Sequence, residues 1–133
     1  MEKFIDHIQS KNFVAGEKLE AEALIVAQKI LVKMGLNFIP ESYIDFLKHY
    51  NGIKANGAYL YGATVDNDID IVDQNSLLRK PQNVILLGHN DFDFLAYNYL
   101  LNCYQIIDRN DLAVLDTYEE TELDLALAEI FNV

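Results

Sequence analysis

The sequence predicts an α+β domain in which helices pack on an antiparallel β-sheet meander. Apolar residues recur at helical spacing within residues 1–52 and again near the C-terminal end, whereas short apolar segments of strand length follow one another between residues 84 and 116. The connections between these later strands are too short for parallel crossovers, so neighbouring strands should run antiparallel. No internal repeat or linker interrupts residues 1–133, and we expect a single domain.

The clearest helical signal lies within residues 40–52. Pro40 suits the first turn, because its missing N–H would have no partner there, and Gly52 can take the left-handed conformation that closes a helix. Between them, apolar side chains recur at the spacing i, i+3, i+4 and i+7, which places them on one face. These side chains are Tyr43, Phe46, Leu47 and Tyr50. Residues 2–9 are expected to form a short helix or a frayed arm.

Two further helices are expected. Residues 17–34 are apolar on most sides and are followed by Gly35, which predicts a core helix covered by neighbours on several sides. The last helix follows a capping box at Thr117 and Glu120, where each residue would satisfy a free backbone N–H of the other. Its apolar residues again form a one-faced helical set, and they are Leu123, Ala126, Leu127, Ile130 and Phe131.

Strand signals occupy the region between the helices. The Asn56-Gly57 pair is a turn signal before a strand at residues 58–61. The continuous apolar run at Val84–Gly88 is typical of a central strand. Three more strands, joined by short turns that contain Asn or Asp, are expected at residues 92–98, 103–108 and 112–116.

An acidic stretch precedes the central strand. Residues 66–73 are expected to form a partly extended loop, and residues 76–79 a single helical turn. Within the loop, Asp66, Asp68 and Asp70 copy the alternating carboxylates that open an EF-hand calcium loop. The likeness then fails, because Ile and Leu replace the turn glycine and the bidentate glutamate. We therefore expect no metal site here, and a metal-dependent hydrolase that uses these aspartates is a minor alternative.

No other pattern indicates a reaction. Cys103 lies within a predicted strand, and His7, His49 and His89 are scattered along the chain without a local pattern that pairs a nucleophile with a base. No P-loop lysine and no GxGxxG motif follows a strand. We expect a protein that is not an enzyme, with no catalytic residue and no cofactor.

The formal net charge of −11 is unevenly distributed. Residues 1–40 hold five acids and five bases, whereas after Pro81 the only base is Arg109, against ten acids. The negative electrostatic field of this acidic region opposes binding to nucleic acid and to anionic membranes, and it favours a basic protein partner. Solubility alone is the simpler explanation of an acidic surface. The pattern leaves the oligomeric state open.

Two features bear on the compartment. No window reaches about 18 uninterrupted apolar residues, so we expect no membrane-spanning segment and no membrane partner. The N-terminal residues lack the pattern of a signal peptide, and the single cysteine excludes an internal disulfide. Both observations favour a cytoplasmic protein.

Residues 39–62 resemble the SUKH superfamily, which contains a fungal cell-wall-assembly regulator domain and many bacterial relatives. Its pattern is an Ile-Pro or Leu-Pro pair, a Tyr three residues on, a Phe-Leu pair, an Asn-Gly pair, and a strand that ends near a glycine. This chain matches it with Ile39-Pro40, Tyr43, Phe46-Leu47, Asn51-Gly52 and Leu60-Tyr61-Gly62, and departs at Ile53, where many relatives carry a second glycine. The resemblance covers about residues 18–131. It implies a SUKH-like α+β fold without known enzymatic activity.

The bacterial members of this superfamily are regarded mainly as immunity proteins. The resemblance therefore implies a domain that binds and neutralises a toxin, often a nuclease. A nuclease needs a positive groove for phosphates, and an acidic domain can occupy that groove through complementary charge. Charge clustering indicates the partner-binding residues Asp66, Asp68, Asp70, Asp91 and Asp93, with Tyr61 as an aromatic anchor. A regulatory or scaffold domain that binds a host protein is the alternative.

Overall fold

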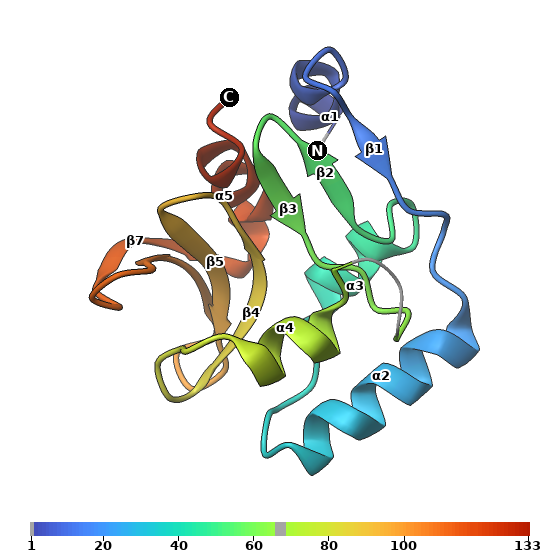
Figure 1. The fold of residues 1–133 in the computed structure, drawn as a ribbon, viewed down its shortest axis with the longest axis vertical. Helices are drawn as coiled ribbons and strands as arrows, with labels where there is room; N and C mark the ends of the chain where they lie inside the picture. Colours follow the sequence, from blue (N-terminus) through green and yellow to red (C-terminus); the bar gives the residue numbers. More distant parts are fainter. Residues whose placement is uncertain (1, 66–68) are drawn as a thin grey trace.

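The computed structural model describes residues 2–65 and 69–133. In this part of the chain, helices pack on a sheet whose strand order is β1-β2-β3-β4-β5-β6-β7 (Figure 1). All neighbouring strands are antiparallel, so the predicted α+β class and the antiparallel meander are confirmed. The helices are α1 (Glu2–Ile8), α2 (Ala21–Lys33), α3 (Glu41–Leu47), α4 (Ile71–Leu77) and α5 (Leu123–Ile130). The strands are β1 (Val14–Ala15), β2 (Ile53–Ala55), β3 (Ala58–Leu60), β4 (Val84–His89), β5 (Asp93–Asn98), β6 (Cys103–Asp108) and β7 (Val114–Glu119).

The apolar faces of α3 and α5 enter the core as predicted. Every apolar residue expected on the inner face of α5 is buried, and the helix packs against β5, β6 and β7. In α3 the side chains of Tyr43, Phe46 and Leu47 are buried. However, α3 ends at Leu47, and Gly52 takes a left-handed φ of 95° in the loop that follows. Gly52 therefore shapes the entry to β2 and does not close the helix.

The helix predicted within residues 17–34 is present as α2, but the prediction that it is a core helix is wrong. The helix begins only at Ala21, and Ala27 and Leu31 are its only buried residues. Ile25, Val26 and Val32 are exposed on its outer side. Figure 1 shows α2 on the rim of the molecule, next to α4. Although its sequence is apolar on most sides, α2 packs against the rest of the protein on one side only.

The acidic stretch leads into a helix, α4, that was not predicted from the sequence. Asp70 caps the N-terminus of α4, where its Oδ1 accepts a hydrogen bond from the N–H of Asp73 at 2.9 Å. The buried side chain of Asn75 donates to the carbonyl oxygens of Ile71 and Leu86 and accepts from the N–H of Leu86 at 2.8 Å. Because α4 spans Ile71–Leu77, the single helical turn predicted at residues 76–79 is wrong. The amide of Asn75 continues the hydrogen bonding along the edge of β4 where β3 has ended.

The predicted capping box before the last helix is also wrong. Strand β7 continues through Thr117 to Glu119, and a short 3-10 turn at Glu120–Glu122 leads into α5. The capping box joins Glu119 and Glu122, and the N–H of Glu119 donates to Oε1 of Glu122 at 2.8 Å. β7 starts later than predicted, because the β6–β7 turn extends to residue 113.

Candidate protein-binding surface

The motif residues between 39 and 62 form a structural junction. The buried hydroxyl of Tyr43 lies 2.6 Å from the carbonyl oxygen of Tyr61 and 3.1 Å from that of Leu87, and donates to both. The side chain of Asn51 accepts from the N–H of Ala63 and donates to Oγ1 of Thr64, both at 2.7 Å. These bonds hold α3 and the loop after it against β3 and β4.

Glycine is required where this junction is tightest. A Cβ atom at Gly62 would lie 2.6 Å from the carbonyl oxygen of Asn51, and one at Gly16 would lie 2.1 Å from the same oxygen. Real Cβ contacts do not come this close, so a side chain at either position would force the backbones apart. The motif therefore serves the fold, and its polar groups are engaged with backbone and with each other.

The structure buries two of the residues predicted to contact a partner. Tyr61 is fully buried, and its hydroxyl lies 2.5 Å from Nδ1 of His89. Asp70 is only 1% exposed, because it caps α4. Neither side chain is available to a partner at the surface, so these two predictions are corrected. Asp66 and Asp68 lie outside the described residues.

The contact between Tyr61 and His89 belongs to the interior. Burial raises the pKa of Tyr61, an effect that the charge of Arg109 opposes only partly, so its hydroxyl stays protonated and shares a hydrogen bond with Nδ1 of His89. Burial, and then the charge of Arg109, lowers the pKa of His89 to about 4, although Asp91 acts in the opposite direction. The imidazole is therefore neutral near pH 7.

The remaining predicted residues, Asp91 and Asp93, lie at one end of the sheet. Oδ1 of Asn90 accepts from the N–H groups of Phe92 and Asp93 at 2.9 and 2.8 Å, which closes the β4–β5 turn. The N–H of Arg109 donates to the carbonyl of Phe92 at 2.9 Å, and its Nη1 donates to the carbonyl of Asn90 at 2.7 Å. The β4–β5 and β6–β7 turns are thus bonded to each other.

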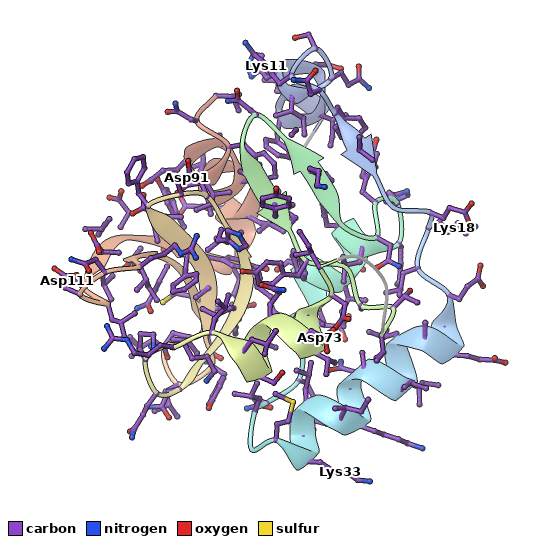
Figure 2. The ribbon with its side chains drawn as sticks, in the orientation of Figure 1. Lys11, Lys18, Lys33, Asp73, Asp91 and Asp111 are labelled. Carbon is purple, nitrogen blue, oxygen red and sulfur yellow. The ribbon has the colours of Figure 1, made fainter. Side chains whose placement is uncertain are left out.

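Acidic side chains gather on these two turns around an exposed aromatic ring. We call the set Asp91, Phe92, Asp93, Asp108 and Asp111 the acidic turn surface. Figure 2 shows Asp91 and Asp111 projecting outward on the same side of the molecule. Phe92 is 76% exposed, and it borders a hollow of about 340 Å³ between the two turns.

Negative charge on this surface is concentrated. Asp93 lies directly opposite Asp108 in the β5–β6 register, and both are acidic. Burial, and then the charge of Asp108, raises the pKa of Asp93. Cations near this surface include Arg109, whose guanidinium lies 5.2 Å from the ring centroid of Phe94 on β5, and Arg79, whose Nη2 donates to the carbonyl of Asn110 in the β6–β7 turn at 2.9 Å. A cation from a partner would relieve the repulsion between the two carboxylates.

The exposed position of Phe92 was not predicted. The sequence pattern places this residue at the start of a strand at residues 92–98, whereas β5 begins at Asp93 and Phe92 lies in the turn. The signal was present in the sequence, because the ring stands between two aspartates directly after Asn90. An aromatic residue in a short polar turn cannot be covered by its neighbours along the chain.

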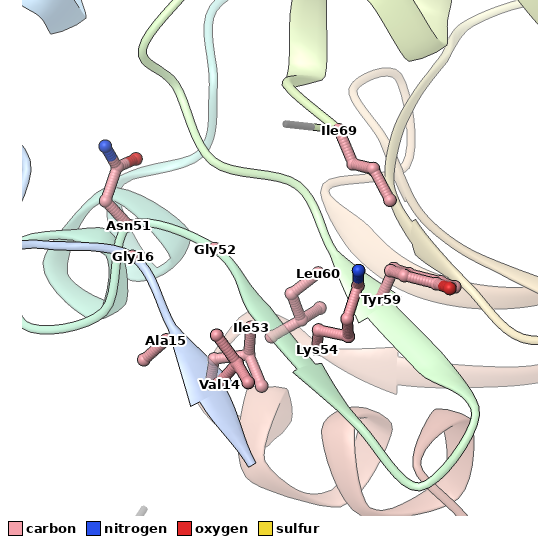
Figure 3. A pocket seen from close by; sticks show the side chains of 10 residues that line it. All are labelled: Val14, Ala15, Gly16, Asn51, Gly52, Ile53, Lys54, Tyr59, Leu60 and Ile69. Atoms are coloured by element: carbon pink, nitrogen blue, oxygen red, sulfur yellow. The ribbon is translucent and has the colours of Figure 1, made fainter. Parts of the chain in front are cut away.

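A second hollow lies over β1, β2 and β3 and has a volume of about 300 Å³ (Figure 3). Figure 3 shows Lys54 and Tyr59 side by side on adjacent strands, and Nζ of Lys54 is 5.3 Å from the centroid of the Tyr59 ring. The rest of its lining is largely apolar or glycine. None of the described residues that line it carries a carboxylate.

Among the residues that the structure describes, no group of three or more His, Cys, Asp or Glu side chains could hold a metal ion. Within the same residues, no helix has the length and apolar character needed to cross a membrane. Comparison with protein-family models gives no match, and comparison with curated proteins gives none either.

Proposed function

We propose that this protein is a non-catalytic, SUKH-like binding domain that neutralises a basic toxin, such as a nuclease, through the acidic turn surface. The observation that carries the proposal is the position of Phe92, an exposed ring flanked by Asp91 and Asp93 and faced by the second acidic turn. Energetically dominant interface residues are typically large side chains at the centre of a polar rim. The ring would supply that centre and the carboxylates would supply the rim.

Charge supports the same proposal. The chain carries a net charge of −11, and the segment that forms β4 to α5 contains ten acids and a single base. A nuclease presents a positive groove to its nucleic-acid substrate, so the two surfaces would attract each other before contact. Such steering raises the association rate and selects partners by the sign of their charge. The proposal includes a cytoplasmic location.

The motif junction supports the SUKH-like assignment within this proposal. The residues that resemble the superfamily pattern bond to one another through Tyr43 and Asn51, which gives that pattern a physical reason. The alternative, a regulatory or scaffold domain that binds a host protein, is favoured by one observation. The outer side of α2 exposes Ile25, Val26 and Val32, an apolar face suited to a contact that does not depend on charge.

Neutralising the acidic turn surface is expected to weaken binding in a salt-dependent manner. The variant combines Asp91→Asn, Asp93→Asn and Asp111→Asn, and the ligand is a basic nuclease toxin domain in a catalytically inactive form, taken from the neighbouring gene where that gene encodes one. At low ionic strength the dissociation constant should rise about tenfold or more, mainly through a slower association rate. At high salt the native protein and the variant should converge, because exposed charges are screened. Stopped-flow mixing and calorimetry give the two quantities.

A matched control removes the same charge elsewhere. Glu17→Gln, Glu20→Gln and Glu22→Gln change three exposed acids at and before the start of α2, far from the two turns (Figure 1). This control should bind almost as tightly as the native protein. Equal weakening by both triple variants would mean that net charge acts without a defined surface, and salt-independent binding would favour the apolar face of α2.

A further inference from the structure

Strand β7 is an open edge of the sheet. It runs from Val114 to Glu119 and pairs with β6, and no other strand within the described residues pairs with its outer side. Figure 1 shows β7 on the outer margin of the molecule. Its residues are exposed except for Tyr118, which is half-buried. Alternate residues of such a strand turn their N–H and C=O groups outward, where another chain can pair with them.

Carboxylates flank this edge on both faces of the sheet. Asp116 and Tyr118 lie on the face covered by α5, and the hydroxyl of Tyr118 donates to Oε1 of Glu129 at 2.5 Å. Burial raises the pKa of Glu129; the bond from Tyr118 opposes this shift, and Asp116 reinforces it. Glu119 lies on the opposite face. Side chains of an added strand would therefore meet acid on either side of the sheet.

This arrangement disfavours a second copy of the chain as the occupant. If two β7 edges paired, Asp116 and Glu119 of one copy would approach the same acids of the other, and like charges on adjacent strands are destabilising. Leu115 is an extra residue in the pairing, because Ile106 faces Asp116 and Ile107 faces Val114. The resulting bulge further limits pairing between identical edges. A basic strand from another protein is not repelled by these acids, and it does not have to pair with an identical copy of the bulged edge.

We propose that the β7 edge binds an extended basic segment of the partner as an added strand. Backbone hydrogen bonds to the outer side of β7 would supply affinity, and Lys or Arg at alternate positions beside Asp116 and Glu129 would supply specificity. The site continues directly from the acidic turn surface, because Asp111 lies in the turn that leads into β7. The inference rests on the proposed function, in which the partner is basic, and states how that partner is held.

The test uses two short peptides that alternate lysine and valine, identical except that one has its backbone amides N-methylated. Both carry the same charge, but only the unmodified peptide can donate backbone hydrogen bonds to β7. With the isotope-labelled full-length protein, the unmodified peptide should shift the amide signals of Asp116–Glu119 and slow the solvent exchange of the alternate amides among them that face outward. The N-methylated peptide should bind at least about tenfold more weakly, because several hydrogen bonds are lost.

Variants localise the contact. The double variant Asp116→Asn with Glu129→Gln should bind the unmodified peptide more weakly than the native protein does. Glu22→Gln on α2 should bind this peptide with native affinity. Equal affinity for both peptides, or signal shifts away from β7, would overturn strand addition. Exchange protection of β7 without peptide, together with a dimer in sedimentation, would also overturn it. If strand addition fails but the native protein still binds the toxin, the proposed function stands. If the native protein does not bind the toxin at all, the proposed function itself is rejected.

Discussion

Replacement of Asn75 by leucine is expected to lower the free energy of unfolding by about 3 kcal/mol. The side chain of Asn75 is buried, and its amide makes three hydrogen bonds of 2.8 to 2.9 Å to the backbone of Leu86 and Ile71. Leucine has a similar size but no polar atoms, so the N–H and C=O of Leu86 would be buried without this partner. When one partner of a buried hydrogen bond is removed, the loss of folding free energy exceeds the net contribution of the bond, because the other polar group stays buried without a partner.

Urea denaturation followed by circular dichroism measures this change. Ser76→Ala is the matched control on the same helix, because the Ser76 hydroxyl bonds to the carbonyl of Asp73 at an exposed position. It should change the free energy of unfolding by no more than about 0.5 kcal/mol. A leucine variant as stable as this control would show that α4 is not fastened to β4 through the Asn75 amide.

Replacement of Phe92 by alanine is expected to weaken toxin binding about 30-fold, a loss of about 2 kcal/mol, without lowering stability. The ring is 76% exposed in the free protein, so its removal leaves no cavity in the core. In a complex the same ring would be covered by the partner, and truncation would remove that buried apolar area. Calorimetry gives the affinity, and thermal unfolding checks that the fold is intact.

Phe38 offers a matched control for this substitution. It is also an exposed phenylalanine, 62% exposed, but it lies between α2 and α3, outside the acidic turn surface. Phe38→Ala should bind the toxin with native affinity. A Phe92→Ala variant that also binds with native affinity would mean that the ring is not at the centre of the contact, even if the charges steer the encounter.

The elements that could be predicted from the sequence depend on local patterns. The strand Cys103–Asp108 was predicted with its observed bounds, because an apolar run lies between two turns marked by Asn and Asp. The Asn56-Gly57 turn was also predictable, since both residues adopt the positive φ values, 50° and 77°, that this dipeptide tolerates. The inner face of α5 followed from helical spacing alone. In each case the signal lies within a few neighbouring residues.

The features that the sequence concealed depend on contacts between distant residues. The role of Asn75 is set by Leu86 on β4, and the burial of Tyr61 is set by His89 at the end of the same strand. Neither partner can be identified from spacing. For the same reason a tyrosine suited to a surface contact lies in the interior, whereas Phe92, assigned to a strand, is exposed in a turn. An apolar pattern indicates that a residue can be buried, and the tertiary fold decides which residues are.

Hydrogen–deuterium exchange of the complex with the inactive toxin domain tests the central proposal most directly. The acidic turn surface predicts slower amide exchange at residues 90–93 and 108–113 in the bound protein, continuing into β7 (Val114–Glu119). It also predicts that amides on the outer side of α2 exchange as they do in the free protein. Protection confined to α2, with unchanged exchange in both turns, would contradict the account.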